Sequence, residues 1–261
     1  MGMEHQTAIA YGNKYKNFYY YDFDHIILHE TAHEWWGNSL TAADMQDVWL
    51  QEGFATYSEA LYVEDHYSYK EYLKYLSLYR IMIKNNHPVL GPSGVDYFSY
   101  KDTDVYMKGC WFLHTLRGAL NDDALFFDIL KSFATRYREK TVCTKDFLNV
   151  VNEKTKSDYK WLFDQYLKTR DVPELQVSIA KEEGTNLYKL YYRWENVVEG
   201  FKMPATVILT YGGKYHTKLR LNPETLWGSV KLSPENGQTK PGIIFNPNDG
   251  YYTLRTFKGN P

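Results

Sequence analysis

The chain has 261 residues, which is enough for one large domain or two of ordinary size. Its formal net charge is −2 and it contains no long basic run, so its electrostatics argue against a nucleic-acid partner. Its apolar runs are too short to predict a membrane span.

Apolar residues recur at helical spacing through the first two thirds of the chain. After an extended segment at 1–21, the spacing predicts helices at 22–38, 45–66, 69–84, 105–120, about 122–138, 144–156 and 159–168. A loop rich in proline and glycine is expected at 87–99. The 25 tyrosines are interpreted as compositional bias, not as a binding signal.

The pattern changes near Pro173, where alternation with a period of two residues takes over. It predicts strands at 175–179, 187–194, 205–211, 214–221, 228–232 and 251–257, with a hairpin turn at Gly212-Gly213. Short strands at this spacing are typical of an antiparallel β-sandwich. We therefore predict two domains, a mainly helical one at 1–170 and a β-sandwich at 171–261.

The strongest chemical signal is the sequence His-Glu-Thr-Ala-His at 29–33. Residues four apart lie on one face of a helix, so His29 and His33 can present two imidazoles to one metal ion. Glu30 projects beside them and can reach a metal-bound water. Glu52, on the following predicted helix, can supply the third ligand. Two histidines and one glutamate leave the fourth position open to water, as catalytic zinc requires, so we predict one zinc ion per chain.

Glu59 lies seven residues after Glu52, which is nearly two helical turns, so the two share a face. It can accept the free imidazole N–H of a ligating histidine, as outer partners of metal ligands do. It can equally be a solvated glutamate on the helix surface. The sequence leaves both interpretations open.

Three stretches resemble the aminopeptidase N family of gluzincin zinc metallopeptidases, which also includes the leukotriene hydrolase. The first is the predicted helix at 29–38, and eighteen residues separate its His33 from Glu52. The second is Trp-Leu-Gln-Glu-Gly at 49–53, and the third is Val-Tyr-Met-Lys-Gly at 105–109. The last is similar to the family's Tyr-Glu-Lys-Gly. The resemblance implies a truncated thermolysin-like, mainly helical zinc-peptidase catalytic domain followed by an antiparallel β-sandwich.

The resemblance also implies a role for each site residue. Glu30 would take a proton from a metal-activated water, and the hydroxyl of Tyr106 would stabilise the oxyanion. Gly2, Met3 and Glu4 look like the end of the family's exopeptidase strand, whose glutamate grips the free amino group of a peptide substrate. His5 stands where the family has asparagine, and this departure puts fine specificity in doubt. The expected reaction is removal of the N-terminal residue from peptides.

Met1 occupies the position of the motif's first glycine, so we expect a fragment that lacks the N-terminal domain of a longer enzyme. That upstream domain is the expected intramolecular partner, and by itself the chain is expected to hydrolyse peptides slowly or not at all. Two alternatives stay open: a zinc endopeptidase of the same class and a non-catalytic peptide-binding fragment. Epoxide hydrolysis, known from the leukotriene hydrolase, has no specific support in this sequence.

Overall fold

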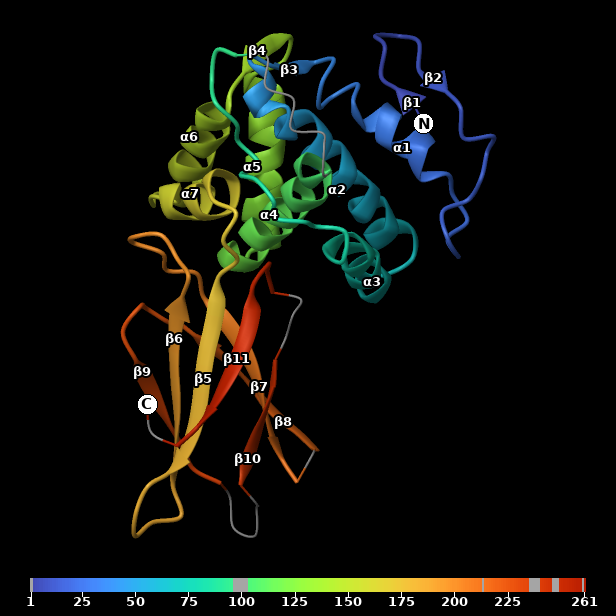
Figure 1. Ribbon diagram of the computed structural model, residues 1–261. Coiled ribbons are helices and arrows are strands. Elements are labelled where there is room, and N and C mark those ends of the chain that lie inside the picture. The colour runs from blue at the N-terminus through green and yellow to red at the C-terminus, as the bar shows by residue number, and fades with distance from the viewer. Residues whose placement is uncertain (1, 96–102, 213, 235–239, 246–248, 260) are drawn as a thin grey trace. The chain divides into compact units, whose positions relative to one another are not determined.

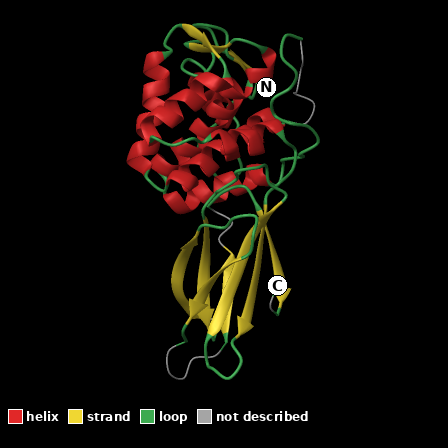
Figure 2. Cartoon of the chain, turned by 90° about the vertical axis from the view of Figure 1, so that its left-hand side faces the viewer, coloured by secondary structure: helices red, strands yellow, loops and turns green. Residues whose placement is uncertain are grey.

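The computed structural model describes residues 2–95, 103–212, 214–234, 240–245, 249–259 and 261. The chain divides into two compact units, Met1–Arg170 and Asp171–Pro261. Helices belong to the first unit and the long strands to the second (Figure 2). Met1, Gly213 and the part of the expected loop at 96–99 lie outside the described residues.

All the helices predicted from the spacing are present in the first unit. They are α1 (His25–Ala32), α2 (Trp49–His66), α3 (Tyr69–Arg80), α4 (Asp104–Leu120), α5 (Asp123–Arg136), α6 (Thr144–Thr155) and α7 (Lys160–Lys168), and a 3-10 turn at Met45–Asp47 precedes α2. Two short strand pairs accompany them: β1 (Gly2–Met3) runs antiparallel to β2 (Ala10–Tyr11), and β3 (Leu40–Ala42) runs parallel to β4 (Lys140–Val142). Among the described residues, no helix has the length and apolarity needed to cross a bilayer.

Three of these helices are at least four residues shorter than predicted. The helix expected at 45–66 begins at Trp49, because a 3-10 turn occupies Met45–Asp47. The helix expected at 22–38 starts after its cap Asp24 and stops at Ala32, because the chain then turns through Gly37, whose φ is +151°. The helix expected at 69–84 stops at Arg80. There the backbone N–H groups of Lys84 and Asn85 donate to the carboxylate of Asp104 at 2.8 and 2.7 Å, which holds the segment away from the helix axis.

Helices α2 and α4 lie side by side (Figure 1), and a contact between two glycines determines how closely they approach. A Cβ atom on Gly53 would lie 2.9 Å from Cα of Gly109, which is closer than carbon atoms can pack. Gly53 follows Glu52 in sequence, and Gly109 lies three residues after Tyr106. The close crossing therefore brings two predicted site residues, one from each helix, to the same region of the unit.

The core beneath the start of α2 is aromatic. The Trp49 ring contacts Phe54 and Phe112 with centroids 5.7 and 5.1 Å apart, and Phe54 contacts Phe147 at 5.1 Å. The indole Nε1–H of Trp49 donates to Thr144 Oγ1 at 2.8 Å. Rings of this size bury large apolar areas, so this cluster fixes the first turn of α2, which carries Glu52.

The second unit contains two sheets, which Figure 1 shows as separate layers. One has the order β10-β7-β8, formed by Pro241–Phe245, Ala205–Tyr211 and Lys214–Leu221. The other has the order β11-β5-β6-β9, formed by Thr253–Lys258, Glu174–Lys181, Tyr188–Glu195 and Gly228–Leu232. Trp194 on β6 is buried, and its indole N–H donates to the carbonyl of Met203, just before β7.

Two features of this unit differ from the sequence prediction. The pairing is not antiparallel throughout, because β11 runs parallel to β5, with Thr253 opposite Glu174. Strand β10 was not predicted; it is short and starts with Pro241-Gly242, residues that usually interrupt strands. The expected hairpin is present in that β7 and β8 are antiparallel and pair Tyr211 with Lys214.

Candidate active site

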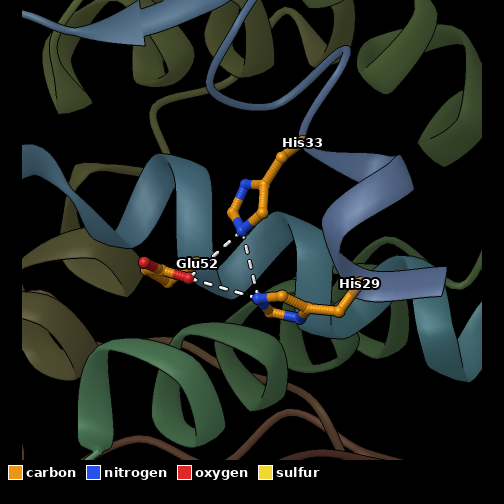
Figure 3. Close-up of side chains that lie close together, drawn as sticks. All are labelled: His29, His33 and Glu52. Atoms are coloured by element: carbon orange, nitrogen blue, oxygen red, sulfur yellow. Dashed lines mark hydrogen bonds and ion pairs between the residues drawn. The ribbon is translucent and has the colours of Figure 1, made fainter. Parts of the chain in front are cut away.

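Two histidines and a glutamate from adjacent helices converge on one point (Figure 3). His29 lies in α1, His33 caps its C-terminal end, and Glu52 lies in the first turn of α2. The Nε2 atoms of the two histidines are 3.1 Å apart. The Oε2 atom of Glu52 lies 3.3 Å from His29 Nε2 and 3.4 Å from His33 Nε2. We call these three atoms the ligand triangle.

The dimensions of the ligand triangle fit a zinc ion. A tetrahedral ion with bonds of about 2.0–2.1 Å separates its ligand atoms by about 3.3 Å, close to all three edges observed. The residues that provide the triangle are buried, with exposed fractions of 8% for His29, 1% for His33 and 7% for Glu52. Imidazole nitrogen and carboxylate oxygen are also the donors that zinc takes in catalytic sites.

The outer nitrogen of each imidazole has its own acceptor. His29 Nδ1–H donates to Glu59 Oε1 and His33 Nδ1–H donates to the carbonyl of Trp36, both at 2.8 Å. Because a carboxylate and a carbonyl can only accept, the Nδ1 atoms carry the protons and the Nε2 lone pairs can face a metal. Glu59 is 2% exposed, so it is a buried partner of the site and not a solvated surface residue.

The charged groups around the ligand triangle favour a bound cation. Burial by itself lowers the pKa of His29, but the hydrogen bonds to Glu52 and Glu59 outweigh it and raise that pKa to about 10. Burial by itself raises the pKa of Glu52, but the hydrogen bonds from His29 and His33 lower it to about 2. Two buried carboxylates thus favour a positive charge at the histidines, which either a proton or a metal ion can provide.

Glu30 and Glu4 lie next to the ligand triangle. Ligand atoms of Glu4, Glu30 and His33 lie within 4.8 Å of one another. Burial raises the pKa of Glu30 above its ordinary value. Strand β1 passes so close that a Cβ atom on Gly2 would lie 2.3 Å from Glu30 Oε1. The strand predicted to bind substrate and the predicted base are therefore neighbours.

A cavity of about 940 Å³ opens in front of these groups. The predicted residues Gly2, Met3, Glu4, Glu30 and Tyr106 all line it, together with the three residues of the ligand triangle and Glu59. The Tyr106 ring lies at the start of α4, with its centroid 5.9 Å from that of His29. The structure thus brings every predicted site residue to one cavity.

Sequence reasoning missed two features of this cavity. One is an apolar wall that includes Phe18, Ile26, Leu78, Met82 and Met107. The other is a pair of buried tyrosines, Tyr75 and Tyr79, whose hydroxyls reach Glu59. Their spacing of four residues predicts a shared face of α3, but it does not indicate that their hydroxyls reach a glutamate on another helix.

Two imidazoles and a carboxylate that converge beside a further buried carboxylate are an arrangement typical of metallopeptidases. The model of the Peptidase family M1 domain matches residues 2–166, and the chain belongs to that family. The predicted family resemblance is confirmed by this match.

Curated relatives and solved structures agree with the family. The chain is 33% identical to mouse aminopeptidase N over 125 residues, which are 43% of this chain and 13% of the mouse protein. Human aminopeptidase N is also 33% identical, over 110 residues, which are 38% of this chain and 11% of that protein. The chain thus spans a small part of the length of these relatives.

Two solved structures share the fold. The structure of aminopeptidase A from Legionella pneumophila, in complex with aspartic acid, has a TM-score of 0.65 and 18% identity, and the match covers 88% of this chain and 26% of that chain. An M1 zinc metallopeptidase from Deinococcus radiodurans, a mutant bound to a Tyr-Ser-Ala substrate, has a TM-score of 0.55 and 24% identity. That match covers 65% of this chain and 37% of the other.

Proposed function

We propose that this chain carries the metal centre of a zinc-dependent aminopeptidase, which hydrolyses the N-terminal residue from peptides by means of a metal-activated water. The observation that carries the proposal is the ligand triangle, whose edges of 3.1, 3.3 and 3.4 Å fit a zinc ion. Membership of peptidase family M1 and the similarity to aminopeptidase N support the choice of reaction.

His29, His33 and Glu52 would hold one zinc ion per chain. When bound, the ion supplies Lewis acidity, lowering the pKa of a coordinated water to about 7 and polarising the scissile carbonyl. The hydrogen bonds from the two Nδ1–H groups orient the imidazoles so that both Nε2 lone pairs point to the same place. Three protein ligands leave one position open for water and substrate.

Glu30 is proposed as the general base, which accepts the proton of the attacking water and later delivers it to the leaving amine. It is buried beside the ligand triangle but is not one of its corners. Because burial raises the pKa of its carboxyl, Glu30 holds a proton more readily than an exposed glutamate does. A base that also returns the proton benefits from this shift.

Glu4 is proposed to pair with the α-ammonium of the substrate, while Gly2 and Met3 line the same wall. The carbonyl of Glu4 accepts a hydrogen bond from Asn38 Nδ2 at 3.0 Å, and β1 is paired with β2. These contacts hold the backbone at Glu4 next to Glu30. An ammonium partner held next to the proposed base would select the first peptide bond for cleavage.

Tyr106, which lines the same cavity, is proposed as the hydrogen-bond donor to the oxyanion. We further propose that 1–170 is the C-terminal part of a thermolysin-like catalytic domain and that 171–261 is a β-sandwich domain. Peptides with a free N-terminus are the proposed substrates, and an upstream domain of a longer enzyme is the proposed partner.

Metal analysis tests the centre directly. We expect one zinc ion per chain after purification in zinc-containing buffer without chelators, and little zinc in a Glu52→Ala variant, because the triangle loses a corner. Glu64→Ala is the matched control: it removes a glutamate from the same helix but from a pair with Arg117, away from the cavity. Full zinc occupancy in Glu52→Ala would show that Glu52 is not the third ligand.

Cleavage of a matched pair of substrates tests the aminopeptidase assignment. In the longer enzyme that includes the proposed upstream domain, we expect a fluorogenic leucyl or alanyl arylamide to be cleaved and its N-acetyl derivative to be resistant, because Glu4 needs a positively charged amine. Glu4→Gln should lower kcat/KM for the free amine by about 10–100-fold, the usual worth of a hydrogen bond to a charged group. Equal cleavage of both substrates by that unsubstituted enzyme would indicate an endopeptidase.

A further inference from the structure

Glu59 is held by hydroxyl groups that nothing in the proposed reaction uses. Its Oε1 accepts from His29, and its Oε2 accepts from Tyr75 at 2.5 Å and also from Tyr79. The two hydroxyls contact each other at 2.8 Å. We call Tyr75 and Tyr79 the tyrosine pair.

The tyrosine pair is positioned by the helix that carries it. Residues four apart lie on one face of a helix, so both rings of α3 point at the same side of α2. Both are buried, and Phe18 packs against them with ring centroids 5.4 Å from Tyr75 and 6.2 Å from Tyr79. A phenol ring has two side-chain torsions, so packed rings leave the hydroxyls little freedom to move away from Glu59.

Fixing Oε2 also fixes Oε1, because the carboxylate is planar and rigid. A carboxylate held at one oxygen can rotate about its last torsion, which is broad and carries a low barrier. With the second oxygen held by two donors, Oε1 stays directed at His29 Nδ1 and the imidazole stays directed at the ligand triangle.

We infer that Tyr75 and Tyr79 are positioning residues for the metal centre: through Glu59 they hold His29 in the orientation that binds zinc. The inference rests on the proposed metal centre and adds to it a pair of residues on a third helix. Because both hydroxyls bind one oxygen, either can retain part of the function when the other is lost.

The test compares zinc affinities of the purified chain, measured against a chromophoric chelator. We expect Tyr75→Phe and Tyr79→Phe each to weaken zinc binding by less than about tenfold, and the double variant by about 10–100-fold, the range for loss of an outer partner of a ligating histidine. The loss in the double variant should exceed the product of the two single losses, because the hydroxyls substitute for each other.

Tyr72→Phe is the matched control. Tyr72 is a fully buried tyrosine of the same helix, but its hydroxyl contacts His114 Nδ1 at 2.7 Å and the Tyr57 hydroxyl at 2.9 Å, not Glu59. It should lower Tm as the other variants do and leave zinc affinity unchanged. The visible absorption of the cobalt-substituted chain adds a readout of ligand geometry, which should change in the double variant and not in Tyr72→Phe.

Unchanged zinc affinity and cobalt spectrum in the double variant would overturn the inference while leaving the metal centre in place. An equal loss of affinity in Tyr72→Phe would also overturn it, because general destabilisation would then explain the effect. Failure of the unsubstituted chain to bind zinc would instead refute the proposed centre and the inference with it. If the double variant does not fold, Glu59→Gln takes its place and should weaken zinc binding within the same range.

Discussion

Replacing Glu30 with glutamine in the longer enzyme that includes the proposed upstream domain is expected to lower kcat by about 10²–10⁴-fold, the usual contribution of a general base, while one zinc ion per chain stays bound. Glutamine has the same shape as glutamate but cannot accept the proton of the attacking water. Glu30 is not a corner of the ligand triangle, so its loss leaves the three proposed ligands in place. Initial rates on a fluorogenic arylamide and elemental analysis of the same sample measure the two quantities together.

Glu34→Gln provides the control for this substitution. Glu34 lies one turn further along the chain, is partly exposed and accepts a hydrogen bond from Asn38 Nδ2 at 3.3 Å. A substitution of this kind away from the cavity should change kcat by no more than about twofold. If Glu30→Gln kept a kcat within tenfold of the unsubstituted protein, another group would have to be the base.

The histidines of the site could be predicted because their geometry is local. His29 and His33 share a helical face whatever the rest of the chain does, since the spacing of four residues alone determines this. Glu52 is harder to predict, because its approach depends on how α1 meets α2. Its position on the next predicted helix indicates that it can supply the third ligand, and the resemblance of the stretch around it to a known family supports the choice. The close contact of Gly53 and Gly109 gives a physical reason for the glycines in two of the stretches that carry the resemblance.

The tyrosine pair could not be predicted, because its significance depends on a neighbouring helix. Tyr75 and Tyr79 have the spacing of any buried helical face, and most residues with that spacing serve only the core. Their hydroxyls become informative only when α3 lies against α2 at the level of Glu59. The same limit applied to Glu59, which sequence reasoning left undecided between a buried and a solvated residue.

In the second unit, the positions of most strands could be predicted, but the directions in which they pair could not. Alternation predicted where β5 and β11 lie, but it carries no information on the direction in which strands pair. Their parallel pairing joins Thr253 to Glu174 across most of the unit. Such long-range contacts depend on the connections between strands, which the local pattern does not describe.

Tyr106 was predicted from the family resemblance as the residue that stabilises the oxyanion, and its position in the structure supports that role. It lies on α4, and its ring lies beside that of His29, with centroids 5.9 Å apart and an interplanar angle of 30°; both residues line the cavity. The Gly53–Gly109 contact keeps α4 close to the helix that carries Glu52. A donor held on a rigid helix loses little freedom when it binds a developing oxyanion, and this preorganisation is the source of its effect.

In the longer enzyme that includes the proposed upstream domain, Tyr106→Phe is therefore expected to lower kcat by about 10²–10³-fold, the usual result of removing one oxyanion donor. Zinc content should be unchanged, because the substitution keeps the ring beside His29 and removes only the hydroxyl. Tyr19→Phe is the control: Tyr19 lines the same cavity but is 68% exposed. The measurement is kcat on the free-amine arylamide for both variants. An unchanged kcat in Tyr106→Phe, or an equal loss in Tyr19→Phe, would show that the oxyanion donor is a different group.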